Sequence, residues 1–310
     1  MKPKIYIDGK EGTTGLQIYD RLGGRDDIEL LLIDDDKRKD TAERKKLINS
    51  ADIVFLCLPD DAAREAVAMA KPTTRIIDAS TAHRTLPGWA YGFAELSPAH
   101  RANIASGTRV AVPGCYASGF IALVYPLIQA GVLEKDYPLV CLAMSGYSGG
   151  GRRMIEQYQA EARADELESP RLYALTQEHK HLPEMAYVCG LDRPPVFCPS
   201  VADYYAGMTV TVPLRAECLK KPITRSAIRE IYAKHFAGQS LVQVLEDAPE
   251  GFLGSHFLAN RDIMQLGVAG NDERILLTAC LDNLGKGASG AAVQCMNLML
   301  SLPETTGLQL

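Results

Sequence analysis

The first quarter of the chain alternates short apolar runs with helical patterns, and this order limits the possible folds more than any other feature. Residues 4–8 have the composition of a buried strand, a glycine-punctuated turn follows, and residues 16–22 have helical spacing. Further strand-like and helical runs then alternate at residues 28–33, 41–50, 52–59, 60–70 and 75–80. This pattern predicts a doubly wound, Rossmann-like α/β domain whose ligand lies at the carboxyl ends of parallel strands.

The turn after the first strand carries Gly9, Gly12 and Gly15, and Thr13 and Thr14 open the helix that follows. Glycines let the backbone approach a pyrophosphate, which the helix N-terminus then holds. The spacing is Gly-x-x-Gly-x-x-Gly instead of the common Gly-x-Gly-x-x-Gly. We therefore predict that these residues bind a dinucleotide, and the alternative is a turn without chemical role.

The segment after the second strand bears on which dinucleotide binds. Asp34 lies about 20 residues beyond the glycine turn, where an acidic side chain usually holds the ribose 2′-hydroxyl of NAD. Lys37 and Arg38 follow closely and could instead hold the 2′-phosphate of NADP. These residues leave NAD and NADP both open, and a solvated charged turn is the third interpretation.

Cys115 stands where an extended run ends and a long apolar run begins. Residues 108–112 have strand character, Pro113-Gly114 interrupts them, and residues 120–128 are apolar enough for a buried helix. A cysteine beside the unpaired N–H groups of a first helical turn has a stabilised thiolate. The alternative is one more buried cysteine, because the eight cysteines show no Cys-x-x-Cys spacing and resemble reduced core residues.

The second half of the chain has longer, β-rich runs and predicts an α+β domain with a mostly antiparallel sheet. We expect a dinucleotide-binding domain at residues 1–114 together with a C-terminal helix at 287–310, and a catalytic and oligomerisation domain at 115–286. Its predicted elements are strands at 140–144, 206–214, 263–267 and 274–281 and helices at 153–164 and 223–236.

Two polar motifs in this half could complete a site around Cys115. His179 and His181 stand two apart, and an imidazole beside a reactive cysteine supplies the proton transfer that acyl chemistry needs. Arg152 ends a glycine-rich loop whose N–H groups and guanidinium suit an anion. The alternative for each histidine is an ordinary surface or core residue. The alternative for the loop is that it has no ligand and merely contains an arginine.

Bulk properties exclude several classes of function. A chain of 310 residues with net charge −5 has room for about two domains and no basic surface for nucleic acid. No apolar run reaches the roughly 18 residues of a membrane span, and the N-terminus lacks a signal-peptide pattern. We expect a cytoplasmic protein with no membrane partner, and no metal site, because the histidines lack cysteines at zinc-finger spacing.

Taken together, the motifs resemble those of N-acetyl-gamma-glutamyl-phosphate reductases of the short, type 2 form. They occur in the order of that family and span nearly the whole chain: Gly9-x-x-Gly12-x-x-Gly15, Val112-Pro113-Gly114-Cys115-Tyr116, Ser145-Gly146-Tyr147-Ser148-Gly149, His179-Lys180-His181-x-Pro183-Glu184, Gly207-Met208 and Asp282-Asn283-Leu284-x-Lys286-Gly287-Ala288.

The resemblance implies a C-terminal domain like that of glyceraldehyde-3-phosphate dehydrogenase and reduction of N-acetylglutamyl 5-phosphate to the 5-semialdehyde in arginine biosynthesis. Cys115 would form a thioester, and His179, or as second choice His181, would carry the proton. The remaining assignments are NADP binding by Ser145, Gly146 and Asn283 beside the glycine turn, Lys37 and Arg38, and substrate binding by Arg84, Arg152 and Ser148.

Alternatives keep part of this chemistry. An aspartate-semialdehyde dehydrogenase or a reductase of carrier-bound aminoadipyl phosphate would use the same logic on a related fold, and NAD could replace NADP. A non-catalytic dinucleotide-binding redox sensor would leave the histidines and Arg152 without a role. The resemblance also favours a homo-oligomer, either a dimer or a tetramer.

Overall fold

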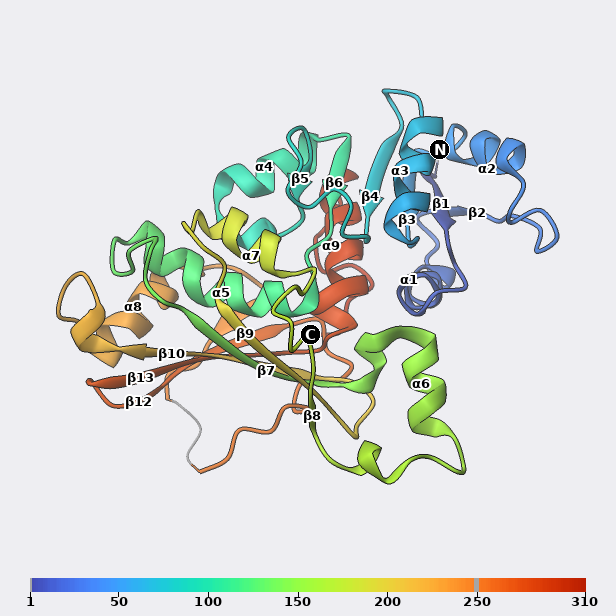
Figure 1. The fold of residues 1–310 in the computed structure, drawn as a ribbon. Coiled ribbons are helices and arrows are strands. Elements are labelled where there is room, and N and C mark those ends of the chain that lie inside the picture. The colour runs from blue at the N-terminus through green and yellow to red at the C-terminus, as the bar shows by residue number, and fades with distance from the viewer. Residues whose placement is uncertain (1, 248–250) are drawn as a thin grey trace. The chain divides into compact units, whose positions relative to one another are not determined.

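The computed structural model describes residues 2–247 and 251–310 (Figure 1). The chain divides into two compact units that each combine separate stretches of sequence. Unit 1 comprises Met1–Pro113 and Ala288–Leu308, and unit 2 comprises Gly114–Gly287 and Gln309–Leu310. Each unit carries its own sheet.

Unit 1 contains a six-stranded sheet in the order β2-β1-β3-β4-β6-β5, and every neighbouring pair is parallel. This confirms the predicted doubly wound domain. Its elements are β1 (Lys4–Asp8), α1 (Thr13–Gly23), β2 (Glu29–Leu31), α2 (Thr41–Ile48), β3 (Ile53–Leu56), α3 (Asp60–Met69), β4 (Arg75–Asp78), β5 (Ala90–Tyr91), a 3₁₀ turn (Ala94–Leu96), α4 (Pro98–Ser106), β6 (Arg109–Ala111) and α9 (Gly290–Met299).

Alternating side chains of the central strands supply two cores, one on each face of this sheet. Ile5 and Phe55 belong to the core that also contains apolar residues of α1 and α9. Tyr6 and Val54, their neighbours along the strands, pack with α2 and α3. Since strand residues alternate between faces, a strand buried on both sides must be apolar throughout, as residues 4–8 and 53–56 nearly are.

The strand order places a topological switch between β1 and β3. The chain leaves β1 for β2 on one side and returns to β3 on the other. Ligands of open α/β sheets bind in the crevice at the carboxyl ends of such strands. The glycine turn of residues 9–15 directly follows the carboxyl end of β1 and therefore lies at this edge.

Unit 2 contains a seven-stranded sheet in the order β11-β12-β13-β10-β7-β9-β8. The sheet is mixed: the pairs β7/β9 and β11/β12 are parallel, and the other neighbouring pairs are antiparallel, as mostly predicted. Its elements are α5 (Cys115–Gln129), β7 (Val140–Gly146), α6 (Gly151–Gln159), β8 (Arg171–Leu172), α7 (Leu182–Cys189), β9 (Val196–Ala202), β10 (Met208–Arg215), α8 (Arg225–His235), β11 (Val242–Val244), β12 (Met264–Gly270) and β13 (Arg274–Leu281), with 3₁₀ turns at Tyr147–Gly150, Asp165–Glu168 and Ala216–Cys218.

Helix α5 is the central helix of unit 2 and packs on β10 and β13, with α7 and α8 beside it (Figure 1). It is apolar on nearly all sides, which is typical of a buried helix. Gly119 lets it approach the sheet, because a Cβ there would lie 2.7 Å from the side chain of Val210. The close packing fixes the first residue of the helix, Cys115, relative to the sheet.

Two predicted helices have other bounds in the structure, and a further helix was not predicted. The helix predicted at 153–164 ends at Gln159, because Ala160 is extended and the backbone turns away. The C-terminal helix, predicted at 287–310, begins with a π-helical turn at Gly285–Ser289 and ends at Met299, so residues 300–310 are not helical. Helix α4 was missed, although Ser97 caps it by accepting the N–H of His100 at 3.2 Å.

Candidate active site

The glycine turn of unit 1 is tightly packed at two of its three glycines. Gly9 has a φ of +88°, and a Cβ there would lie 2.4 Å from the carbonyl oxygen of Cys57 at the end of β3. A Cβ on Gly15 would lie 2.3 Å from the Gly9 oxygen. Packing within the protein therefore requires glycine at both positions.

Gly12 differs from these two glycines. It caps the N-terminus of α1, and a Cβ there would meet only ordinary contacts, the nearest at 3.5 Å from the Gly9 oxygen. The protein itself does not need a glycine at this point. A cradle that a Cβ would fill, at a helix N-terminus and a topological switch, fits the pyrophosphate of a dinucleotide.

The charged segment after β2 lies at the surface of unit 1. The Lys37 Nζ atom lies 2.8 Å from a carboxylate oxygen of Asp34, and Arg38 is exposed. The Lys37 ammonium holds the pKa of Asp34 below its usual value, and the carboxylate raises the pKa of Lys37. Exposed pairs of this kind contribute little to stability, so Lys37 can exchange Asp34 for another anion at small cost.

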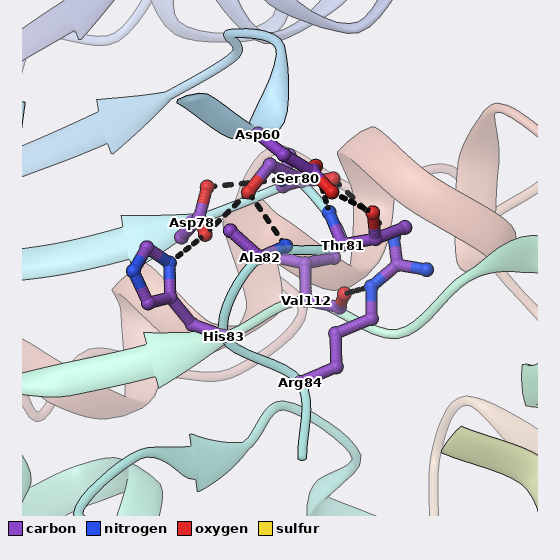
Figure 2. A network of polar contacts seen from close by, with 9 residues as sticks. Asp60, Asp78, Ser80, Thr81, Ala82, His83, Arg84 and Val112 are labelled. Atoms are coloured by element: carbon purple, nitrogen blue, oxygen red, sulfur yellow. Dashed lines mark hydrogen bonds and ion pairs between the residues drawn. The ribbon is translucent and has the colours of Figure 1, made fainter. Parts of the chain in front are cut away.

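A buried polar network follows the carboxyl end of β4 (Figure 2). Asp78 accepts the Ser80 hydroxyl at 2.7 Å, and its Oδ2 atom lies 2.6 Å from Nδ1 of His83. The His83 ring stacks on Trp89 with 4.1 Å between centroids. This network fixes the loop that carries Arg84, and the sequence reasoning attached no role to His83.

Arg84 is itself buried at the end of this loop. Its Nε donates to the Val112 carbonyl at 2.9 Å (Figure 2). Its Nη2 donates to the Ala79 carbonyl at 3.3 Å. These bonds join the segments that follow β4 and β6. The guanidinium therefore has a structural use within unit 1, whereas binding of a substrate anion by Arg84 stays a prediction.

Cys115 is the first residue of α5 and is partly exposed. Gly114, its N-cap, is extended and offers no side chain to the first helical turn. By contrast, burial raises the pKa of the Cys57, Cys141 and Cys189 thiols. Accessible cysteines at helix N-termini are the ones that react as thiolates, and deeply buried ones are inert.

An aromatic cluster joins the Cys115 helix to the two histidines. Tyr116 lies 6.0 Å from His179 and 5.9 Å from His181 between ring centroids, and the two imidazoles are 4.7 Å apart. Tyr173 also contacts His179, with its ring centroid at 5.8 Å. The structure thus brings both predicted histidines to the residue that follows Cys115.

The two tyrosines of this cluster were not found from the sequence. Burial raises the pKa of Tyr116 and of Tyr173, and the nearby Cys115 thiolate adds to both shifts. A hydrogen bond between the two hydroxyls and one from Ser145 tie Tyr116 in place. Its position directly after Cys115 is the one sequence feature that could have indicated that Tyr116 belongs to the site. No feature of the sequence near Tyr173 indicates this.

The backbone of the His181 segment fixes the proton of His179. The N–H of His181 donates to Nδ1 of His179 at 3.1 Å. A neutral imidazole that accepts at Nδ1 carries its proton on Nε2. His179 is thereby set as a hydrogen-bond donor at Nε2.

The predicted residues at the end of β7 form a buried cluster within unit 2. Asn283 accepts the Gly207 N–H at 2.9 Å and donates to the Ser148 hydroxyl at 2.9 Å. Ser145 and Gly146, at the end of β7, precede Ser148 in the chain. A Cβ on Gly146 would lie 2.6 Å from the carbonyl oxygens of residues 204 and 205. Asn283 and Ser148 therefore hold each other, which makes this loop rigid.

The segment after Asn283 reaches the nucleophile itself. A Cβ on Gly287 would lie 2.8 Å from the Cβ of Cys115 and 2.9 Å from the Asp282 carbonyl oxygen. Any larger residue at this position would displace Cys115. Glycine at position 287 allows the backbone of the π-helical turn to pack directly against Cys115.

Arg152 lies apart from this cluster, on the exposed face of α6. Its Nε atom is 2.8 Å from Glu156, and the arginine side chain is 77% exposed.

Throughout residues 2–247 and 251–310, no three side chains of His, Cys, Asp and Glu are grouped so that they could hold a metal ion. In the same described ranges, every helix is too short or too polar to span a bilayer.

Known proteins resemble this chain in both units. Residues 9–104 match the NAD binding domain of semialdehyde dehydrogenases, and residues 115–283 match the semialdehyde dehydrogenase dimerisation domain. The N-acetyl-gamma-glutamyl-phosphate reductase of Sinorhizobium medicae is 51% identical over 97% of this chain and 100% of its own length. A reductase of the same name from Nostoc sp. is 48% identical over 99% of both chains.

Solved structures of lower identity share the fold. Aspartate semialdehyde dehydrogenase II from Vibrio cholerae is 14% identical, with a TM-score of 0.73 over 97% of this chain and 99% of that one. The enzyme from Francisella tularensis is 13% identical, with a TM-score of 0.72 over 97% and 100%. Because its relatives at about half identity match along their whole length, this chain belongs to the N-acetyl-gamma-glutamyl-phosphate reductase family.

Proposed function

We propose that this chain reduces N-acetyl-L-glutamyl 5-phosphate to N-acetyl-L-glutamate 5-semialdehyde and phosphate, with NADPH, in arginine biosynthesis. The observation that carries the proposal is Cys115 at the first residue of α5, beside a cluster that holds two histidines. Full-length similarity to reductases of this name supports the substrate.

The first half-reaction is an acyl transfer to sulfur. The Cys115 thiolate attacks the acyl carbon, a C–S bond forms, and the bond to the phosphate oxygen breaks. Phosphate leaves with the electron pair, and the product is a thioester on Cys115. The N-terminus of α5 stabilises the thiolate before attack, because the first N–H groups of a helix have no partner within it and carry partial positive charge.

The second half-reaction turns the thioester into the aldehyde. When bound, the nicotinamide supplies a hydride to the thioester carbon. Negative charge then develops on the former carbonyl oxygen, and His179 can donate to it from Nε2, the atom that carries its proton. As the carbonyl re-forms, the C–S bond breaks and the Cys115 thiolate leaves, while the Nε2 proton that was shared with the oxygen stays on the imidazole.

NADP is the cofactor we propose, with the pyrophosphate at Gly12 and the first turn of α1. Lys37 and Arg38 are the candidate partners of the 2′-phosphate, since Lys37 pairs with Asp34 at the exposed surface. The carboxylate of Asp34 would repel that phosphate. NAD binding is the competing outcome.

A coupled comparison of substrates tests the proposed function. The purified chain should reduce NADP in the presence of phosphate and N-acetylglutamate 5-semialdehyde, and more slowly with NAD. Aspartate semialdehyde, run beside it, should be a poor substrate. Faster turnover of aspartate semialdehyde would reassign the substrate, and cofactor binding without any turnover would favour a sensor.

Gly12 gives a test of the dinucleotide site that is separable from folding. Gly12→Val should weaken NADP binding by about tenfold or more, because its side chain would fill the proposed cradle while making no close contact in the protein. Gly24→Val is the matched control at the other end of α1, where the Cβ would meet open space. Fluorescence titration with NADPH measures both, and unchanged affinity in Gly12→Val would move the pyrophosphate elsewhere.

The open face of the unit 2 sheet is the proposed surface for a second copy of the chain. Leu142, Met144 and Val196 are 44%, 37% and 55% exposed on strands whose alternate residues are buried. Strand pairing puts Leu142 beside Thr211 on the same face. Residues 115–283 match a dimerisation domain, which supports a copy of the same chain as the occupant.

Substitution of this face should dissociate the oligomer. Leu142→Lys should raise the dimer dissociation constant about 100-fold or more, since it buries a charge in an apolar contact. Leu175→Lys, at a 73% exposed leucine outside the sheet, is the control. Analytical ultracentrifugation decides: an unchanged mass for Leu142→Lys would place the interface on another surface, and a tetramer in the wild type would require a second one.

We also propose the cytoplasm as the location. None of the eight cysteines is in a disulfide, which fits a reducing compartment.

A further inference from the structure

Glu184 is a buried carboxylate that touches both parts of the candidate active site. It lies on α7 and is 1% exposed. Its Oε2 atom accepts the backbone N–H of Gly114 at 3.2 Å, and its Oε1 atom lies 3.9 Å from Nε2 of His181. Gly114 is the N-cap of the Cys115 helix, so one side chain links the nucleophile's backbone to the histidines.

The contact continues from His181 to His179. The His181 side chain faces Glu184, and its backbone N–H donates to Nδ1 of His179. Helices α5 and α7, which begin at these points, also pack against each other. Movement of Glu184 would therefore disturb the cysteine, the His181 ring and the tautomer of His179 together.

The charges around Glu184 favour a cationic partner. A buried carboxylate is costly unless a positive charge or several hydrogen bonds compensate it. The rings that contact His181 are those of Tyr116 on α5 and of His179, and burial keeps Tyr116 neutral by raising its pKa. The imidazole of His181, whose Nε2 atom lies 3.9 Å from Oε1, can balance the carboxylate when it is protonated.

We propose that Glu184 is a positioning residue that holds the Gly114–Cys115 backbone and the histidine pair in one arrangement and stabilises the protonated form of His181. It acts through these groups and does not contact the substrate. The inference rests on the proposed function only in treating Cys115 and the histidines as the reacting centre.

Titration of the histidines tests the pairing without any assay of turnover. In protein labelled with ¹³C-histidine, the titration midpoint of His181, assigned with His181→Asn, should fall by about one pH unit or more in Glu184→Gln. Glutamine can still accept the Gly114 N–H, so folding is preserved while the charge is lost. Glu178→Gln, at an exposed glutamate of the same segment, should leave the midpoint unchanged.

Activity then separates positioning from a merely structural role. Glu184→Gln should lower kcat about tenfold or more with little change in KM, and shift the acidic limb of its pH profile with the His181 midpoint. An unmoved His181 midpoint in Glu184→Gln would overturn the inference. If that midpoint moves but the wild type does not act on N-acetylglutamate 5-semialdehyde, the pairing stands and the proposed function fails.

Discussion

Cys115→Ser should lose about 10⁴-fold or more of the phosphate-dependent oxidation of N-acetylglutamate 5-semialdehyde while NADP binding is unchanged. A hydroxyl at the N-terminus of α5 remains protonated at neutral pH, because its ionisation lies far above that of a thiol. Without the sulfur no thioester forms, so both half-reactions are lost together. Stopped-flow absorbance of NADPH and a binding titration measure the two properties separately.

Cys218→Ser is the matched control for this experiment. Cys218 is exposed, lies outside the histidine cluster and has no role in the proposed chemistry. Its replacement should leave the rate within about twofold, as surface substitutions usually do. Turnover of Cys115→Ser at the wild-type rate would remove Cys115 from the mechanism, whatever the control does.

His179→Asn should reduce kcat by about 10²–10⁴-fold, the usual contribution of a positioned proton donor. The reason is its fixed tautomer: Nδ1 accepts the His181 N–H, which leaves Nε2–H for the oxygen that becomes negative. His181→Asn should cost less, because that residue orients His179 mainly through its backbone. Rates of NADPH formation at saturating substrate measure both variants.

The order of these two losses decides between the histidines. His256→Asn, at an exposed histidine, controls for loss of an imidazole in general. A larger loss in His181→Asn than in His179→Asn would make His181 the proton carrier. Losses of equal, small size in all three would exclude histidine from the rate-limiting proton transfer.

The elements that sequence predicted well are those with local signals. Strand β1, the glycine turn and α1 follow from apolar runs and glycine spacing within about twenty residues. Cys115 at the start of α5 follows in the same way from Pro113-Gly114 and the apolar run behind it. Each of these features is decided by neighbours in the sequence.

The contacts of the site depend on residues far apart in the sequence, and they could not be predicted. The bond from Gly114 to Glu184 spans 70 residues, and that from Gly207 to Asn283 spans 76. Substrate binding by Arg84 stays a prediction, and no feature of the sequence indicated that two of its nitrogens donate to backbone carbonyls. Which polar side chain meets a ligand and which serves the fold is decided by packing.

The most direct test of the account is to trap the acyl group on Cys115. Wild-type protein mixed with NADP and N-acetylglutamate 5-semialdehyde, without phosphate, should form about one NADPH per site and then stop. Mass spectrometry should find an N-acetylglutamyl group on the peptide with Cys115, and added phosphate should release it. NADPH formation with an unmodified Cys115, or an adduct on another residue, would contradict the thioester mechanism.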